Sequence, residues 1–209
     1  MPPHVAIATN KFGATGLSIG AIVKFWKNKK ILWKYAIPFS VLAIVGGLTG
    51  AKFLLEINED ILLRVVGIVL LLFLPIMYFN KDIGTLQRKT SNLKKIIGTI
   101  LYFLLLVFGG FFGGGAGMLI FICLMYFFGF TIIESNATDI VPWFFVSLSS
   151  LIYFSLNGMV ELYIGIALFI GMLIGGYFGA HIAIKKGNKW VKTIFAIIVV
   201  VASIKILFF

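Results

Sequence analysis

The chain has 209 residues, of which 61% are hydrophobic and only 12% are charged. Soluble domains carry about 25% charged residues, so this composition excludes an ordinary soluble globule and indicates a polytopic membrane protein. The formal net charge of +11 would suggest a nucleic-acid partner in a soluble protein, but here the basic residues lie between apolar segments, so we expect a lipid bilayer and no nucleic acid.

The chemically reactive side chains are few and scattered. Cys123 is the only cysteine, so the chain cannot form an internal disulfide, and its apolar surroundings indicate packing. His4 and His181 lie far apart in sequence, which gives a metal site little support. The sequence shows no nucleophile–base pair of the kind that an embedded enzyme needs. We therefore expect no catalytic residue, no metal and no cofactor.

Apolar segments follow one another along the whole chain, at roughly 5–26, 32–52, 61–79, 94–128, 132–156, 161–184 and 189–208. Most are about 20 residues long, which is enough to cross about 30 Å of hydrocarbon as a helix. The segment from Lys94 to Phe130 is different, because its 37 residues would make one helix of about 55 Å. That length is too long for one crossing and slightly short for two.

A glycine cluster, Gly109–Gly117, divides this long segment and reads Gly-Gly-Phe-Phe-Gly-Gly-Gly-Ala-Gly. Glycine exposes backbone amides, and freed backbone groups at membrane depth must be satisfied by protein or by a polar cavity. Broken helices of this kind form substrate sites in many secondary transporters. We predict one limb over 94–112 and a second, short limb over 116–128. Tight helix packing through small residues is the alternative.

The two halves of the chain resemble each other at a constant shift of 129 residues. This shift aligns Ala8-Thr9 with Ala137-Thr138, and the box Gly46-Gly47-x-x-Gly50-Ala51 with Gly175-Gly176-x-x-Gly179-Ala180. The pattern predicts a first repeat over 1–79, a basic cytoplasmic linker over 80–95 and a second repeat over 96–209. The second repeat opens with the glycine cluster, whose counterpart would precede Met1. We therefore expect the first repeat to lack its opening broken helix.

The charges of the connecting segments indicate how the repeats are oriented. Segments 27–34, 80–95 and 185–192 are rich in lysine and arginine, whereas 53–60 and 157–161 carry acidic residues and no basic ones. Cytoplasmic loops are expected to be basic, and all three basic segments lie on one side only if 94–128 crosses the membrane twice. We therefore predict an all-α, multi-pass protein of the cell membrane, with two inverted-topology repeats and a glycine-broken helix.

Polar residues inside the apolar segments are the candidates for a substrate site. The first repeat offers Thr9, Asn10 and Lys11, the second offers Asn136, Thr138 and Asp139, and the glycine break offers the backbone amides of Gly113, Gly114 and Gly115. We expect Lys11 to contact a small anion, the hydroxyl and amide side chains to add hydrogen bonds, and the glycine amides to hold oxyanion oxygens.

The roles of Lys11 and Asp139 have alternatives. Asp139 would tune Lys11 if the two met near the axis between the repeats, but the same residues could form a purely structural pair. Lys11 could also extend to the lipid headgroups. A buried Asp139 could instead bind and release a proton and so couple transport to protons.

These motifs together resemble the sulfite exporter TauE/SafE family. The resemblance rests on the stretch from His4 to Lys11, the cluster Gly109–Gly117 followed by Ser135-Asn-Ala-Thr138, the two Gly-Gly-x-x-Gly-Ala boxes and the Asn157-Gly158 turn. It implies a membrane permease for sulfur-containing anions such as sulfite, thiosulfate or organosulfonates, with the Ala-Thr-Asn-Lys stretch and the glycine break along its pathway. The alternative is a membrane scaffold or a transport-inactive, truncated paralogue. The oligomeric state is left open.

Overall fold

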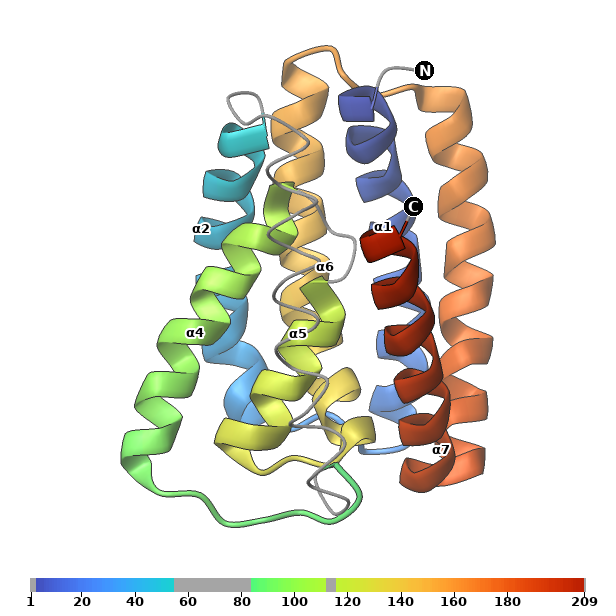
Figure 1. Ribbon diagram of the computed structural model, residues 1–209. Coiled ribbons are helices and arrows are strands. Elements are labelled where there is room, and N and C mark those ends of the chain that lie inside the picture. Colours follow the sequence, from blue (N-terminus) through green and yellow to red (C-terminus); the bar gives the residue numbers. More distant parts are fainter. Residues whose placement is uncertain (1–2, 55–83, 112–115, 209) are drawn as a thin grey trace.

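The computed structural model describes residues 3–54, 84–111 and 116–208, and all regular structure within these ranges is helical. The helices are α1 (Pro3–Lys27), α2 (Trp33–Leu54), α4 (Asn92–Phe111), α5 (Ala116–Cys123), the π-helix η1 (Leu124–Phe128), α6 (Ile132–Leu156) and α7 (Leu162–Phe208). α7 is broken at Gly187, which has φ 83° and ψ 173°, so that its two limbs run in opposite directions (Figure 1). The predicted all-α class is confirmed.

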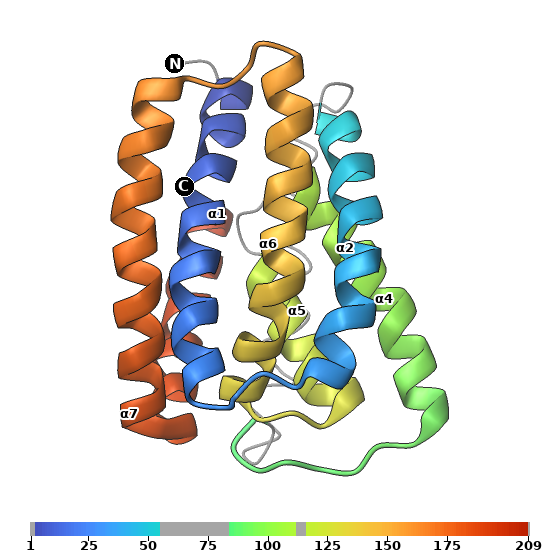
Figure 2. The ribbon, with the colours of Figure 1, turned by 180° about the vertical axis from the view of Figure 1, so that it is seen from behind.

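Four described helical segments are long and apolar enough to cross a membrane, namely Trp33–Phe53, Asn92–Phe111, Ile132–Leu156 and Leu162–Phe195. α1 is as long as α6 but carries more charged residues, three lysines against Glu134 and Asp139. It lies between α6 and α7 in both ribbon views (Figures 1 and 2), so most of its surface contacts protein rather than lipid. Accordingly, its polar residues Thr9, Lys11, Thr15 and Ser18 are all buried inside the bundle.

The long apolar segment forms two limbs, as predicted. α4 ends at Phe111 and α5 begins at Ala116, so the break falls inside the glycine cluster. Figure 1 shows α4 and α5 running in opposite directions, with α5 starting near the middle of the bundle's height. The chain therefore enters the bundle along α4 and returns along α5 to the end at which α4 began. The predicted site residues Gly113, Gly114 and Gly115 lie outside the described residues.

The helices of the two halves run in opposite directions, as inverted repeats require. Under the shift of 129 residues α1 corresponds to α6, and α2 to the first limb of α7; Figure 1 shows that the members of each pair are antiparallel. The contacts repeat as well. The Oγ1 of Thr9 accepts a hydrogen bond from the backbone N–H of Glu161 at 3.1 Å, and the Oγ1 of Thr138 accepts one from Leu32 at 3.2 Å. The shift maps Thr9 onto Thr138 and Leu32 onto Glu161, so the two hydrogen bonds are equivalent under the repeat.

The helix ends follow the same relation. The Asn28 amide donates to the Lys24 carbonyl and the Asn157 amide donates to the Tyr153 carbonyl, both at 2.8 Å. The next residue in each case, Lys29 or Gly158, has a left-handed backbone with φ of 54° or 68°. The sequence repeat is therefore a structural repeat at the level of individual hydrogen bonds.

Close helix packing joins one repeat to the other. A Cβ at Gly47 of α2 would lie 2.9 Å from the Val146 carbonyl oxygen of α6, and a Cβ at the equivalent Gly176 of α7 would collide with the carbonyl oxygen of Leu17 on α1. The shift also maps Leu17 onto Val146, so α1 packs on α7 as α6 packs on α2. Each repeat therefore packs against helices of the other. The predicted domain boundaries, 1–79, 80–95 and 96–209, stay a prediction.

α4 packs on α2, and no described helix packs on α7 in the equivalent way. Gly46 and Gly50 of α2 lie against the backbone of α4, where a Cβ at Gly46 would be 3.0 Å from the Cβ of Leu106. A Cβ at the equivalent Gly175 or Gly179 of α7 would meet nothing within 4 Å. Within the described residues, no helix covers that face of α7.

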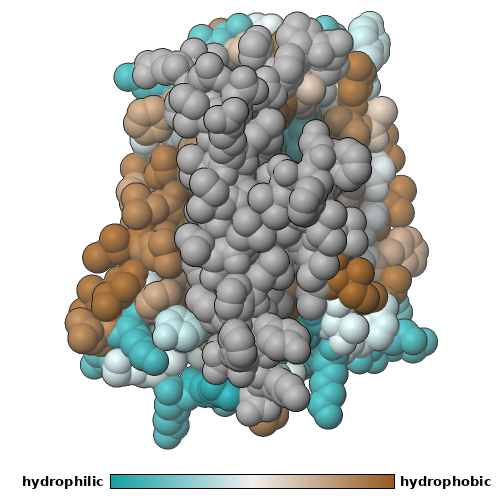
Figure 3. All heavy atoms as spheres, in the orientation of Figure 1, coloured by the Kyte–Doolittle hydropathy of each residue, from teal (hydrophilic) through white to brown (hydrophobic). Residues whose placement is uncertain are grey.

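The connecting segments sort by charge along the bundle. Figure 1 places the turn after α1, the loop 84–91 and the break at Gly187 at one end, which we call the basic end, and the turn 157–161 at the opposite end. Figure 3 shows hydrophilic residues at both ends of the bundle and hydrophobic ones along the flanks. This placement of the connecting segments agrees with the predicted double crossing of 94–128. Most of the acidic segment 53–60 lies outside the described residues.

Candidate functional site

A buried lysine lies where the broken helix ends. Lys11 of α1 is only 2% exposed, and its Nζ donates a hydrogen bond to the backbone carbonyl of Gly109, which lies in the last turn of α4. The carbonyls in the last turn of a helix lack intrahelical partners and carry the negative end of the helix dipole. The glycine break therefore supplies the acceptor that stabilises this ammonium in the bundle.

The indole of Trp143 completes the surroundings of the ammonium. Its ring centre lies 5.7 Å from Nζ, within the range of a cation–π contact, and the ring packs so closely on Gly109 that a Cβ there would lie 2.6 Å from it. No ion pair links Lys11 to a carboxylate among the described residues. An ammonium has three N–H donors, and the structure shows one of them in use.

The end of α4 is held in place by Ser150 of α6. Its hydroxyl lies 3.1 Å from the carbonyl oxygens of both Gly47 on α2 and Gly110 on α4. Because a Cβ at Gly110 would lie 2.8 Å from that Gly47 oxygen, the three helices meet here backbone to backbone. In this conformation the junction sets the position of the carbonyl that Lys11 contacts.

Thr9 and Thr138 were predicted as substrate ligands, and the structure shows their oxygens bonded to helix starts. Thr9 contacts the residue before α7 at the opposite end, whereas Thr138 contacts the residue before α2 at the basic end. The 18 residues of α1 between Thr9 and Lys27 span roughly 27 Å. The two threonines therefore lie toward opposite ends of the bundle, and a single site does not include both.

Asp139 lies apart from Lys11. It is buried on α6, where its carboxyl accepts a hydrogen bond from the Tyr102 hydroxyl of α4 at 2.6 Å, and the Tyr102 ring stacks on Phe39 of α2 at 4.3 Å between ring centres. The structure forms no Lys11–Asp139 pair, and Lys11 does not extend to the headgroups. Proton coupling through Asp139 stays a prediction.

The remaining predicted residues are less enclosed. Asn10 is exposed beside Lys11, and Asn136 is half-buried near the start of α6. The sequence reasoning missed Trp143, Ser150 and Tyr102 as site residues. Each carries a polar group inside an apolar span, which was the available signal.

A comparison with known protein families agrees with this architecture. The model of the family described as sulfite exporter TauE/SafE matches residues 1–206. The chain belongs to the sulfite exporter TauE/SafE family. It is thus a multi-pass protein of the cell membrane in a transporter family, which implies transport rather than catalysis.

Two proteins with similar sequences align with the whole chain. The "Probable membrane transporter protein YfcA" of Escherichia coli (strain K12) is 24% identical over 208 residues, covering 100% of this chain and 77% of the relative. A "Probable membrane transporter protein" of Haemophilus influenzae (strain ATCC 51907 / DSM 11121 / KW20 / Rd) is 23% identical over 208 residues, covering 100% of this chain and 82% of the relative. No solved structure matches the chain.

Proposed function

We propose that this protein transports small anions, with sulfite, thiosulfate and organosulfonates as the first candidates, and that Lys11 is the residue that binds them. The observation that supports this most is a buried ammonium with no described carboxylate partner and with N–H donors to spare. Ionisable groups inside a membrane bundle are expensive and are usually functional.

The sign of the charge favours an anion as substrate. A cation would be repelled by Lys11, whereas an oxyanion can accept hydrogen bonds from its free donors while Gly109 keeps the third. Backbone amides beside the break would add further donors for the same oxygens. A tetrahedral or pyramidal sulfur oxyanion offers three oxygens to such a site.

Substrate entry requires a movement. Lys11 is enclosed by α4 and α6 in this structure, so we infer that the conformation described is closed around it. In the inverted-repeat transporters, one bundle rocks against the other to open the site to alternate sides. Because the C-terminal end of α4 contacts Lys11 through the Gly109 carbonyl, a displacement of α4 would expose the ammonium.

Flux measurements test the proposal. Reconstituted into liposomes, the protein should move at least one of sulfite, thiosulfate and methanesulfonate faster than empty vesicles do. Lys11→Met keeps an unbranched side chain of similar size and removes the charge, so it should lower the apparent affinity by roughly ten-fold or more, the loss expected for a charge-assisted hydrogen bond.

Lys24 provides a matched control on the same helix. Its ammonium lies 5.2 Å from the Tyr177 ring centre and away from the break, so Lys24→Met should transport as the natural chain does. Equal loss in both variants would show a general effect of charge on α1 rather than a site. Absence of flux for all three anions would contradict the proposal and favour a membrane scaffold.

A further inference from the structure

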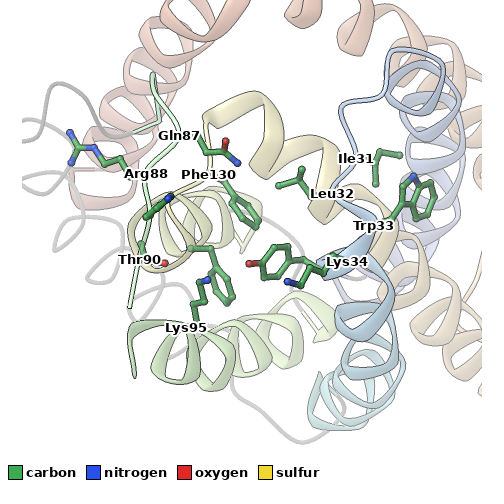
Figure 4. Close-up of a pocket in the computed structure, with 12 residues that line it drawn as sticks. Ile31, Leu32, Trp33, Lys34, Gln87, Arg88, Thr90, Lys95 and Phe130 are labelled. Atoms are coloured by element: carbon green, nitrogen blue, oxygen red, sulfur yellow. The ribbon is translucent and has the colours of Figure 1, made fainter. Parts of the chain in front are cut away.

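A cavity with basic side chains lies at the basic end, outside the transport pathway proposed above. This cavity of about 790 Å³ opens between the start of α2, the loop 84–91, the first turn of α4 and the end of η1 (Figure 4). The described side chains that line it include Lys34, Arg88, Lys89 and Lys95 and none that is acidic. In Figure 4, Lys34 of α2 and Lys95 of α4 approach the cavity from two sides, whereas Arg88 points away from the other labelled side chains.

The walls of this cavity are fixed before any ligand arrives. The backbone N–H of Arg88 donates to the Gly129 carbonyl at 2.8 Å, which holds the loop 84–91 against the turn before α6. On the other side, the Tyr35 ring packs edge-on against Phe128 and Phe130, with ring centres 5.7 and 5.0 Å away. Preorganised walls reduce the entropy lost on binding.

A buried hydroxyl without a partner also lines the cavity. The Oγ1 of Thr90 is inaccessible to solvent and makes no hydrogen bond in the structure. Buried hydroxyls nearly always have a partner, so an unpaired one beside a cavity indicates a ligand atom that accepts its proton. The hydroxyl is available to any hydrogen-bond acceptor, and the lysine charges favour an acceptor that is negatively charged.

The surroundings of the cavity connect it to the lipid. Ile37 and Val41 of α2, and Ile96 and Ile100 of α4, are exposed apolar side chains that continue from the cavity along the two helices. Figure 1 shows α4 leaning away from α2 toward the basic end, so the cavity fills the space where the two helices separate. An anionic headgroup in the cavity would leave its acyl chains lying along these apolar faces.

We propose that this cavity binds a phosphate group, and that an anionic phospholipid of the membrane leaflet at the basic end supplies it. Lys34 and Lys95 hold the phosphate oxygens by charge, and rotation of the Thr90 side chain about its Cα–Cβ bond brings its covered hydroxyl to one of these oxygens as a donor. Basic pockets between membrane helices at the cytoplasmic side are suited to such headgroups.

Thermal unfolding of the full chain in mixed micelles tests this site. Titration with phosphatidylglycerol, but not phosphatidylcholine, should raise the unfolding midpoint to a plateau. The double variant Lys34→Ala/Lys95→Ala should weaken the apparent affinity by about 25-fold, at about five-fold for each lysine. Thr90→Val should weaken it by about five-fold and should not lower the midpoint without lipid, because the buried hydroxyl has no partner to lose.

The control Lys185→Ala/Lys186→Ala removes the same charge from the basic end outside the cavity, and it should change the affinity less than about two-fold. A parallel titration with inorganic phosphate identifies the source, because a lipid ligand should bind at least about ten-fold tighter than the free ion. The proposal is overturned if neither ligand shifts the midpoint. It is also overturned if the control loses as much affinity as the cavity variants.

Discussion

Substitution of alanine at two equivalent glycines should have opposite effects on stability. Gly50 of α2 and Gly179 of α7 correspond under the shift of 129 residues. A Cβ at Gly50 would collide with the carbonyl oxygen of Val107 and lie 2.9 Å from the Cα of Gly110, both backbone atoms of α4. A Cβ at Gly179 would meet no atom of the described residues within 4 Å.

The magnitude follows from two contributions. Glycine to alanine inside a helix gains about 0.5–1 kcal/mol from backbone entropy, and this gain is common to both positions. Overpacking costs about 1–3 kcal/mol, or more where the neighbour is backbone and cannot rotate away, and it applies only to Gly50. The two variants should therefore differ by at least about 1–3 kcal/mol, with Gly179→Ala at or slightly above the natural stability.

Unfolding in detergent measures this difference directly. For a chain of this length, about 2–4 °C in Tm corresponds to 1 kcal/mol, so the variants should be separated by several degrees. The milder pair Gly46→Ala and Gly175→Ala should show the same order with a smaller gap, because a Cβ at Gly46 would lie 3.0 Å from its nearest neighbour. If Gly179→Ala destabilised the protein as much as Gly50→Ala does, the α7 face would be covered in solution and the reasoning would be wrong.

Two further predictions concern the pseudo-symmetry. Thr9→Val and Thr138→Val should each lower the free energy of unfolding by about 1 kcal/mol, because each leaves one backbone N–H at a helix start without its side-chain acceptor. Chemical denaturation would show this, and unequal losses would contradict equivalent roles. Asn157→Cys should react with a membrane-impermeant maleimide in intact cells, whereas Asn28→Cys should react only after permeabilisation, and the buried Cys123 should give no background signal. Labelling of both engineered cysteines from one side would refute the inverted topology.

Length and composition were sufficient to predict most of the fold. The lengths of the apolar segments predict where the spans begin and end. The long segment must break because one continuous helix of its length does not fit a bilayer, and the glycine cluster marks where the break occurs. The first limb was predicted over 94–112 and α4 covers Asn92–Phe111. These features are local, so sequence alone carries them.

The partners of the predicted site residues could not be found in this way. Thr9 and Thr138 were identified as equivalent and polar, but each bonds to a backbone N–H more than 100 residues away. A backbone group has no sequence signature. The inverted topology also explains why Lys11 and Asp139 do not meet. A two-fold axis in the membrane plane places equivalent residues at equal distances above and below the midplane, so two such residues come together only if both lie at the midplane.

The residues that break the pseudo-symmetry gather in one place. Under the shift, Lys11 corresponds to Ile140, Trp143 to Ala14 and Ser150 to Ala21, so each polar or aromatic member of the Lys11 site has an apolar counterpart. The helix that they all contact, α4, has no described counterpart on α7. The shared contacts of the two repeats, such as the threonine caps and the glycine crossings, explain how the bundle holds together and would be present in any protein with this architecture. Under the proposed transport of anions, we expect the binding specificity to come from the part that occurs once, which is the ammonium of Lys11 at the end of the broken helix.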